Sequence, residues 1–128
     1  MMNTKARTAA LITPVGQEAQ DEARALAADG RTGKAARRLR RGSWLKRGPA
    51  REAVELLAGG HALPTSSAQA LDALRRLDAA LVVELTALLD GGQQIAAVKL
   101  LRERTGVDLA GGYHLVLELG GEPDTPSP

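Results

Sequence analysis

The stretch that decides the fold is residues 66–92, which read SSAQALDALRRLDAALVVELTALLDGG. Its leucines recur every three or four residues, the spacing of one face of an α-helix. They are Leu71, Leu74, Leu77, Leu81, Leu85 and Leu88. Ser66 with Gln69 three residues later forms a capping-box pattern, and the glycines at 91 and 92 end the run. We expect one long Leu-striped helix here, with a β-strand over residues 81–85 as the alternative.

Shorter helical runs that end at glycine lie on both sides of this stretch. The expected runs are residues 17–29, 32–42, 49–58 and 93–105. Asp108 is placed to cap a last element that extends from Leu109 to Leu119. Gly111 and Gly112 weaken a helix there by about 1 kcal/mol each, and every second residue from 115 to 119 is leucine. Both a helix and a short strand therefore remain open for this element.

The composition favours helices over strands. Among 128 residues there are 23 Ala and 20 Leu but only 9 Val and Ile, one Trp, one Tyr and no Phe. Because strands draw on β-branched and aromatic residues, an all-β domain is excluded. The absence of Cys excludes disulfide scaffolds and thiol chemistry. We therefore expect a mostly α protein with a thin Ala-Leu core, which has reason to lean on a partner.

The chain divides by composition into five segments. They are a flexible leader over 1–16, a basic helical segment over 17–60, a linker over 61–65, the long helix with a helical hairpin over 66–121, and a disordered, Pro-rich tail over 122–128. No apolar run is long enough for a membrane span, and Thr8, Thr13 and Pro14 interrupt any signal-peptide core. We expect a bacterial-type cytoplasmic location without membrane contact.

A weak internal repeat is visible when residues 29–60 are aligned with residues 90–121. The alignment pairs Asp29-Gly30 with Asp90-Gly91, and nine of the 32 paired positions are identical. In this register three cations of the first copy stand where the second has apolar residues, so the two faces are expected to do different work. The paired positions are Lys34 with Ile95, Arg37 with Val98 and Arg40 with Leu101. Since Ala, Leu, Gly and Arg supply almost all of the matches, a true duplication stays open.

Patterns that carry catalysis or hold cofactors are missing. Residues 30–35 resemble a phosphate-binding loop but lack its first Gly and its Ser or Thr after the Lys. His61 and His114 have no further ligands at metal-binding spacing. We therefore expect no catalytic residue, no cofactor and no metal, and a function other than that of an enzyme.

The charge is concentrated in one segment. Nine cations and no acid lie between Arg31 and Arg51, whereas the rest of the chain has a net charge of −7. We name as nucleic-acid candidates Lys34, Arg37, Arg38, Arg41, Trp44, Lys46 and Arg47. The first four share one helix face, and phosphate contact would explain such crowding of like charge. The alternatives are a solvated face or one docked on acids of the same chain or a second copy, with Trp44 capping the small core rather than stacking on a base.

Residues 94–109 read QIAAVKLLRERTGVDL. This run resembles the first helix and turn of the C-terminal domain of the bacterial ribosomal stalk protein, and the resemblance extends over about residues 88–119. The matching positions are Val98-Lys99, Arg102, Thr105-Gly106 and Leu109. The resemblance implies helices on a small sheet, whose first two helices recruit translation GTPases to the ribosome. It implies contacts by Ile95, Val98, Lys99 and Arg102. The family has Gly where this chain has Asp108 and Lys where it has Ala110 and Tyr113, and the chain lacks the family's remaining strands and helix.

Three functions are therefore expected, all without catalysis. The first is a module that binds a translation factor or the ribosome through Lys99, Arg102 and their apolar neighbours. The second is binding of RNA or DNA through residues 31–51. The third is an oligomeric adaptor in which the leucine stripe from Leu71 to Leu88 pairs with a second copy.

Overall fold

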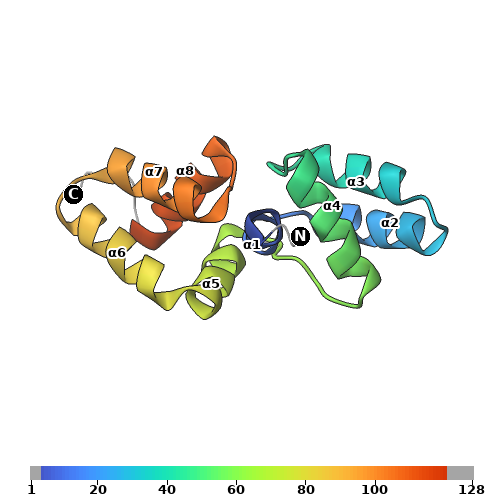
Figure 1. Ribbon diagram of the computed structural model, residues 1–128, viewed down its shortest axis with the longest axis horizontal. Helices are drawn as coiled ribbons and strands as arrows, with labels where there is room; N and C mark the ends of the chain where they lie inside the picture. The colour runs from blue at the N-terminus through green and yellow to red at the C-terminus, as the bar shows by residue number, and fades with distance from the viewer. Residues whose placement is uncertain (1–3, 121–128) are drawn as a thin grey trace.

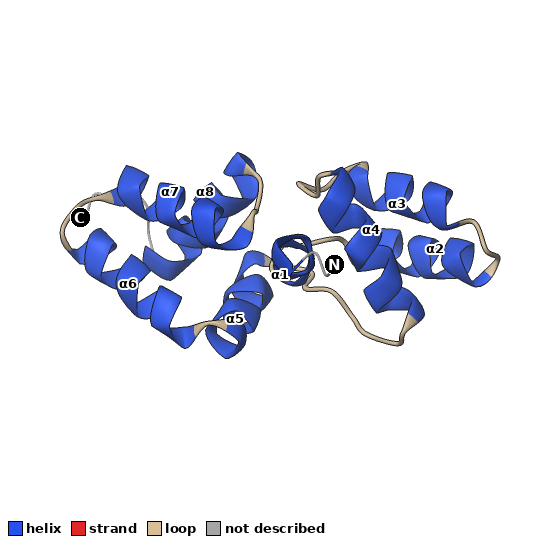
Figure 2. Ribbon diagram, viewed as in Figure 1, coloured by secondary structure: helices blue, strands red, loops and turns tan. Residues whose placement is uncertain are grey.

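The computed structural model describes residues 4–120, which form eight α-helices and no strand (Figures 1 and 2). The helices are α1 (Thr4–Leu11), α2 (Gln17–Ala28), α3 (Thr32–Arg40), α4 (Arg47–Ala58), α5 (Ser67–Leu77), α6 (Ala79–Asp90), α7 (Gln94–Thr105) and α8 (Leu109–Gly120). The expected helical fold is confirmed. The strand alternatives at 81–85 and 115–119 are wrong, because the buried side chains there follow helical spacing: Leu81 with Leu85, and Leu115 beside Val116. The proposed tail over 122–128 lies outside the described residues.

The helices form two bundles with α1 between them (Figure 1). Helices α2, α3 and α4 pack on one another, as do α5 to α8, while α1 contacts α4, α5 and α7. Ala9 and Ile12 belong to the core of the α5–α8 bundle, whereas Ala10 and Val15 belong to that of the α2–α4 bundle. Burial of both faces of α1 therefore ties the two bundles together.

Two segments expected to be loose are packed. Residues 4–16 of the expected leader form α1 and the chain that follows it, where Ile12 and Val15 are buried. The expected linker buries Leu63, and its backbone is held by the amide of Gln20, itself fully buried. Gln20 accepts from the Leu63 N–H at 2.9 Å and donates to the carbonyls of Leu63 and Val15 at 3.0 and 2.8 Å. These bonds satisfy polar groups that burial would otherwise leave unpaired.

The long Leu-striped helix is two helices, because Asp78 begins a new one. Its backbone has φ −155° and its carboxylate accepts from the Leu81 N–H at 3.0 Å, which caps α6. The stripe consequently changes direction, and Leu77 remains exposed at the corner. The predicted cap at the other end is confirmed: the Ser66 hydroxyl accepts from the Gln69 N–H at 3.1 Å.

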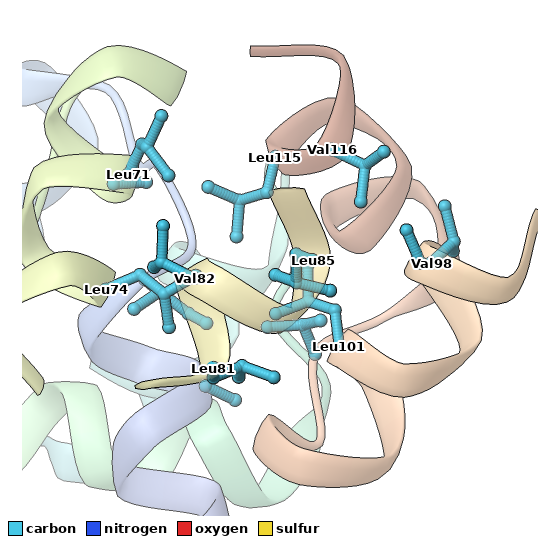
Figure 3. Close-up of a cluster of buried hydrophobic side chains, with 14 residues drawn as sticks. Leu71, Leu74, Leu81, Val82, Leu85, Val98, Leu101, Leu115 and Val116 are labelled. Atoms are coloured by element: carbon cyan, nitrogen blue, oxygen red, sulfur yellow. The ribbon is translucent and has the colours of Figure 1, made fainter. Parts of the chain in front are cut away.

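The leucine stripe fills the core of its own bundle (Figure 3). Side chains from α5, α6, α7 and α8 converge there and are buried. The labelled ones are Leu71, Leu74, Leu81, Val82, Leu85, Val98, Leu101, Leu115 and Val116. A second copy therefore has little of this stripe left to pair with.

The two halves repeat each other in structure, in a register one position away from that of the sequence letters. Helices α2, α3 and α4 begin at residues 17, 32 and 47, and α6, α7 and α8 begin at residues 79, 94 and 109, at a constant offset. We call two residues related by this offset equivalent. The sequence alignment pairs Gly30 with Gly91, whereas the structural offset pairs Gly30 with Gly92. Gly30 and Gly92 have φ of +78° and +75°. The sequence alignment is therefore shifted by one residue from the structural one. The structurally equivalent glycines are the two that adopt the left-handed conformation, not the two that follow an aspartate.

A hydroxyl group ends α3 and α7 in a similar way. The Ser43 hydroxyl donates to the Leu39 carbonyl, and the Thr105 hydroxyl donates to the Leu101 carbonyl. Leu39 and Leu101 are equivalent residues, and both are fully buried. The two halves therefore share details of their helix ends as well as the order of their helices.

Candidate functional site

A groove of about 420 Å³ lies between α7 and α8. Its walls are formed by Gln94, Ile95, Val98, Lys99, Arg102, Leu109 and Tyr113. All four residues expected to contact a protein partner line this groove: Ile95, Val98, Lys99 and Arg102. The structure thus brings the expected contact residues together on one surface.

The rim of the α7–α8 groove exposes large apolar side chains. Ile95 is 86% exposed, Leu109 56% and Tyr113 44%, whereas Val98 is buried at the floor. Only two further large hydrophobic residues are exposed in residues 4–120, and neither lines the groove. The apolar surface of the described chain is therefore concentrated at one place.

Two cations and no acid complete the groove. Lys99 and Arg102 are exposed, and neither makes an ion pair within residues 4–120. Leu109 and Tyr113 also line the groove but are not among the contact residues predicted from the sequence, although their spacing indicates a shared face. These two residues are four apart, so they share a face once α8 is known to be a helix.

The turn between α7 and α8 sets the shape of the groove. Gly106 has φ +77°, which ends α7, and the Asp108 carboxylate accepts from the Ala110 N–H at 3.3 Å at the start of α8. Gly111 and Gly112, which are expected from the sequence to weaken a helix, both lie buried within α8. A Cβ at Gly112 would lie 3.2 Å from Cγ of Arg102. The missing side chain thus allows α7 and α8 to approach closely.

The expected nucleic-acid residues lie on two elements. Lys34, Arg37, Arg38 and Arg41 line one groove between α2 and α3 with Glu22 and Leu26, as the helical spacing predicts. Lys46 and Arg47 are exposed at the start of α4. Arg38 donates to Glu22 at 2.5 Å. This hydrogen bond lowers the pKa of Glu22 and raises the pKa of Arg38. Of the four cations, Arg38 is thus the one that forms an ion pair within residues 4–120.

Trp44 packs against the other bundle. Its ring stacks on that of His114 in α8, with the centroids 4.5 Å apart and the planes 8° apart. A Cβ at Gly111 would lie 3.8 Å from the Trp44 side chain. One face of the Trp44 ring is therefore covered by His114, and Trp44 belongs to neither of the two buried core clusters.

Among the described residues, the remaining titratable groups form no candidate metal site. No group of three or more His, Asp or Glu residues within 4–120 is arranged to hold a metal ion. None of the helices in that range combines the length and hydropathy that crossing a bilayer requires. Comparisons with protein-family models, with curated proteins and with solved structures find no match to the chain.

Proposed function

We propose that the chain is a non-enzymatic protein-interaction module whose α7–α8 groove binds a segment with apolar and acidic side chains. The observation that carries this proposal is the cluster of Ile95, Leu109 and Tyr113, exposed around a groove that Lys99 and Arg102 flank. Burial of those side chains by a partner removes apolar surface from water, which favours association. An amphipathic helix with acidic residues beside its apolar face fits this surface.

The charge of the groove selects among apolar partners. Because Lys99 and Arg102 have no acid beside them in the groove, a basic segment is disfavoured and an acidic one is attracted. Tyr113 enlarges the apolar part, since an aromatic ring presents a large area with few rotatable bonds. The fitting occupant is therefore an acidic, apolar helix rather than a purely charged one.

The proposed partner is a translation factor or a ribosomal component. This part of the proposal rests on the resemblance of residues 94–109 to the stalk domain, whose first two helices recruit translation GTPases. Helices α7 and α8 occupy the corresponding stretch of this chain and enclose the groove. The departure at Tyr113 replaces a cation by a ring, so the interface is expected to be more apolar than that of the family.

Isothermal titration of the full chain with purified elongation and initiation GTPases tests the proposal. The key variant is Ile95→Asp, which places a charge in the apolar rim without disturbing the core, because Ile95 is exposed. The matched control is Val83→Asp, at a residue of α6 that is also exposed but lies outside the groove. We expect the wild type and Val83→Asp to bind a GTPase alike, and Ile95→Asp to lose at least about tenfold in affinity.

The charge reversal Lys99→Glu with Arg102→Glu tests the acidic character of the partner. It should weaken binding and reverse its dependence on salt, because the groove would then repel an acidic partner and added salt screens that repulsion. Binding by neither GTPase class would rule out a translation GTPase as the partner, and equal binding by Ile95→Asp would contradict the role of the groove. Light scattering distinguishes a second copy as the occupant, because a dimer that Ile95→Asp dissociates would replace the translation partner by the chain itself.

A further inference from the structure

The first half of the molecule carries a second surface, which is basic where the second half is apolar. Between Arg31 and Arg51 there are nine cations, and within residues 4–120 only Arg38 of these makes an ion pair. The other eight are exposed: Arg31, Lys34, Arg37, Arg40, Arg41, Lys46, Arg47 and Arg51. Within residues 4–120, ion pairs with acids therefore involve one of these nine cations.

The structural repeat places part of this charge in an equivalent of the α7–α8 groove. A groove of about 350 Å³ lies between α3 and α4, lined by Thr32, Gly33, Ala36, Arg51, Val54 and Glu55. Four of these residues are equivalent to residues that line the α7–α8 groove: Thr32, Gly33, Ala36 and Arg51. The two grooves are thus the same feature of the repeated fold.

Residues equivalent to the apolar rim of the α7–α8 groove include two arginines, of which Arg51 lines the α3–α4 groove beside Glu55. Gly33 is equivalent to Ile95, Arg47 to Leu109 and Arg51 to Tyr113. The two cations of the α7–α8 groove, Lys99 and Arg102, have cations at their equivalent positions in the first half, namely Arg37 and Arg40. We call Arg37, Arg40, Arg47 and Arg51 the α3–α4 basic surface; Lys34 and Arg41 extend it toward α2.

We infer that the α3–α4 basic surface binds the phosphate backbone of a nucleic acid without reading its sequence. This function goes beyond the proposed one and uses the other half of the molecule. Arginine recognises phosphate through two parallel N–H donors, and all four residues that define the surface are arginines. Binding to several phosphates releases condensed counterions, which supplies affinity without base contacts.

Two further observations favour nucleic acid over other anionic partners. None of the large exposed hydrophobic residues in the described chain lies between 31 and 51, and a membrane-binding surface needs such residues to insert. Trp44, the aromatic residue of this segment, is stacked on His114. One face of this ring is therefore closed to a base, whereas the arginines of the α3–α4 basic surface are exposed and suited to the phosphate backbone.

Fluorescence anisotropy with the full chain tests the inference. The probes are labelled single-stranded RNA of about 20 nucleotides and duplex DNA of about 20 base pairs, both of mixed sequence. With about five phosphate contacts, the affinity for the single strand should fall about 100-fold between about 50 and about 200 mM salt. A preference for either nucleic acid agrees with the inference. An affinity that is insensitive to salt would overturn it.

The repeat supplies a matched control for net charge. Arg37→Gln with Arg40→Gln and Lys99→Gln with Arg102→Gln each remove two exposed cations, at equivalent positions of the two halves. We expect the first pair to weaken binding about tenfold or more at about 0.1 M salt and to flatten the salt slope by about 1.4 for single-stranded RNA. The second pair should leave binding within about twofold. Circular dichroism and thermal melting verify that each variant is folded.

The outcomes separate the possible sources of affinity. If both pairs of substitutions weaken binding equally, attraction to net charge alone replaces the α3–α4 basic surface. If vesicles of phosphatidylserine and phosphatidylcholine bind as tightly as RNA and compete with it, an anionic membrane replaces nucleic acid. If Ile95→Asp still binds RNA, the α3–α4 basic surface acts independently of the α7–α8 groove. If Ile95→Asp loses RNA binding, the inference is contradicted.

Discussion

The two halves of the molecule share a backbone and differ in what they place on it. Equivalent core positions carry the same residue where α3 and α7 are buried: Ala35 with Ala97, and Leu39 with Leu101, all 0% exposed. Equivalent surface positions differ in kind, as in Arg51 against Tyr113. Burial fixes size and polarity, whereas exposure leaves both free to change. Two surfaces of different chemistry can therefore be carried by one fold.

The cores also differ in how they are filled. Three alanines of the first half, Ala19, Ala23 and Ala53, stand where the second half has Leu81, Leu85 and Leu115. The first half recruits other groups to its core, among them Val15 and Leu63 from the adjoining chain. Both cores thus take in residues outside the repeat, since Ile12 and Leu74 belong to the core of the second half.

The largest expected effect on stability comes from truncating either of the two equivalent buried leucines, one in each core. Leu39→Ala and Leu101→Ala each delete a fully buried side chain and leave a cavity. Each should lower the free energy of unfolding by about 2–5 kcal/mol, measured by urea denaturation and circular dichroism. Because α1 is part of both cores, we expect one cooperative transition in each variant.

The exposed Val83 provides a control for this pair of variants, since Val83→Ala should change the stability by no more than about 0.5 kcal/mol. A second transition in either variant would show that the bundles unfold separately. A large loss for only one leucine would show that the two positions are not equivalent in packing.

Much of the fold could be predicted from the sequence, because its helices end at local signals. Gly30, Gly42 and Gly106 end helices with φ of +78°, +87° and +77°, as expected for the left-handed position. The break at Asp78 was missed because the leucine spacing continues across it, and only the cap bond from the Leu81 N–H reveals the corner. Periodicity reports which face is apolar, not whether the helix is continuous.

The packing of remote segments could not be predicted. Ile12 lies in a stretch without long periodicity, yet it is buried against another bundle. The role of Gln20 depends on Leu63, which is distant in the sequence. For the site, helical spacing placed Ile95 and Lys99 correctly on one surface, whereas the position of Trp44 depended on the arrangement of the two bundles. Local pattern carries no information about such contacts.

The next expected effect concerns the contact that joins the halves. His114→Ala removes the ring on which Trp44 stacks and should lower the free energy of unfolding by about 0.5–1.5 kcal/mol. The fluorescence of Trp44, the sole tryptophan, should shift to the red as water reaches the uncovered ring face. His61→Ala is the control, because His61 is exposed and has no ring partner in the described chain. An unchanged spectrum in His114→Ala would contradict the stacking.

A smaller effect, of opposite sign, is expected at the glycines of α8. Gly111→Ala should raise the free energy of unfolding by about 0.4–1 kcal/mol, since its Cβ would make only ordinary contacts at 3.8 Å and alanine favours the helix. Gly112→Ala should gain less or lose stability, because Arg102 at 3.2 Å must shift. The equivalent of Gly112 in the first half is Ala50, so the closer approach is particular to α7 and α8. Equal gains in both variants would contradict this difference.

Both halves hold an acid at one equivalent position and pair it differently. Glu22 of α2 is equivalent to Glu84 of α6. Glu22 accepts from Arg38, while Glu84 accepts from Arg104 at 3.1 Å, about one turn further along the next helix. Helix α3 ends at Arg40, whereas α7 continues to Thr105, so the later partner exists only in the second half. Leu100 stands at the position equivalent to Arg38, and Gly42 at the position equivalent to Arg104, so the residues at these positions decide which cation the acid meets.

The smallest expected effect is the dependence of the Glu22–Arg38 ion pair on pH. The hydrogen bond from Arg38 lowers the pKa of Glu22 in the folded chain, so the charged pair stabilises the fold above the ordinary pKa of the carboxyl group. That contribution is lost as the pH falls through the lowered pKa. Glu22→Gln should therefore reduce the melting temperature slightly at neutral pH, and the difference from wild type should vanish near about pH 2. Glu55→Gln, an exposed acid without an ion pair in residues 4–120, should show no such dependence. A difference that persists undiminished in acid would mean that Glu22 stabilises α2 and α3 by packing rather than by charge.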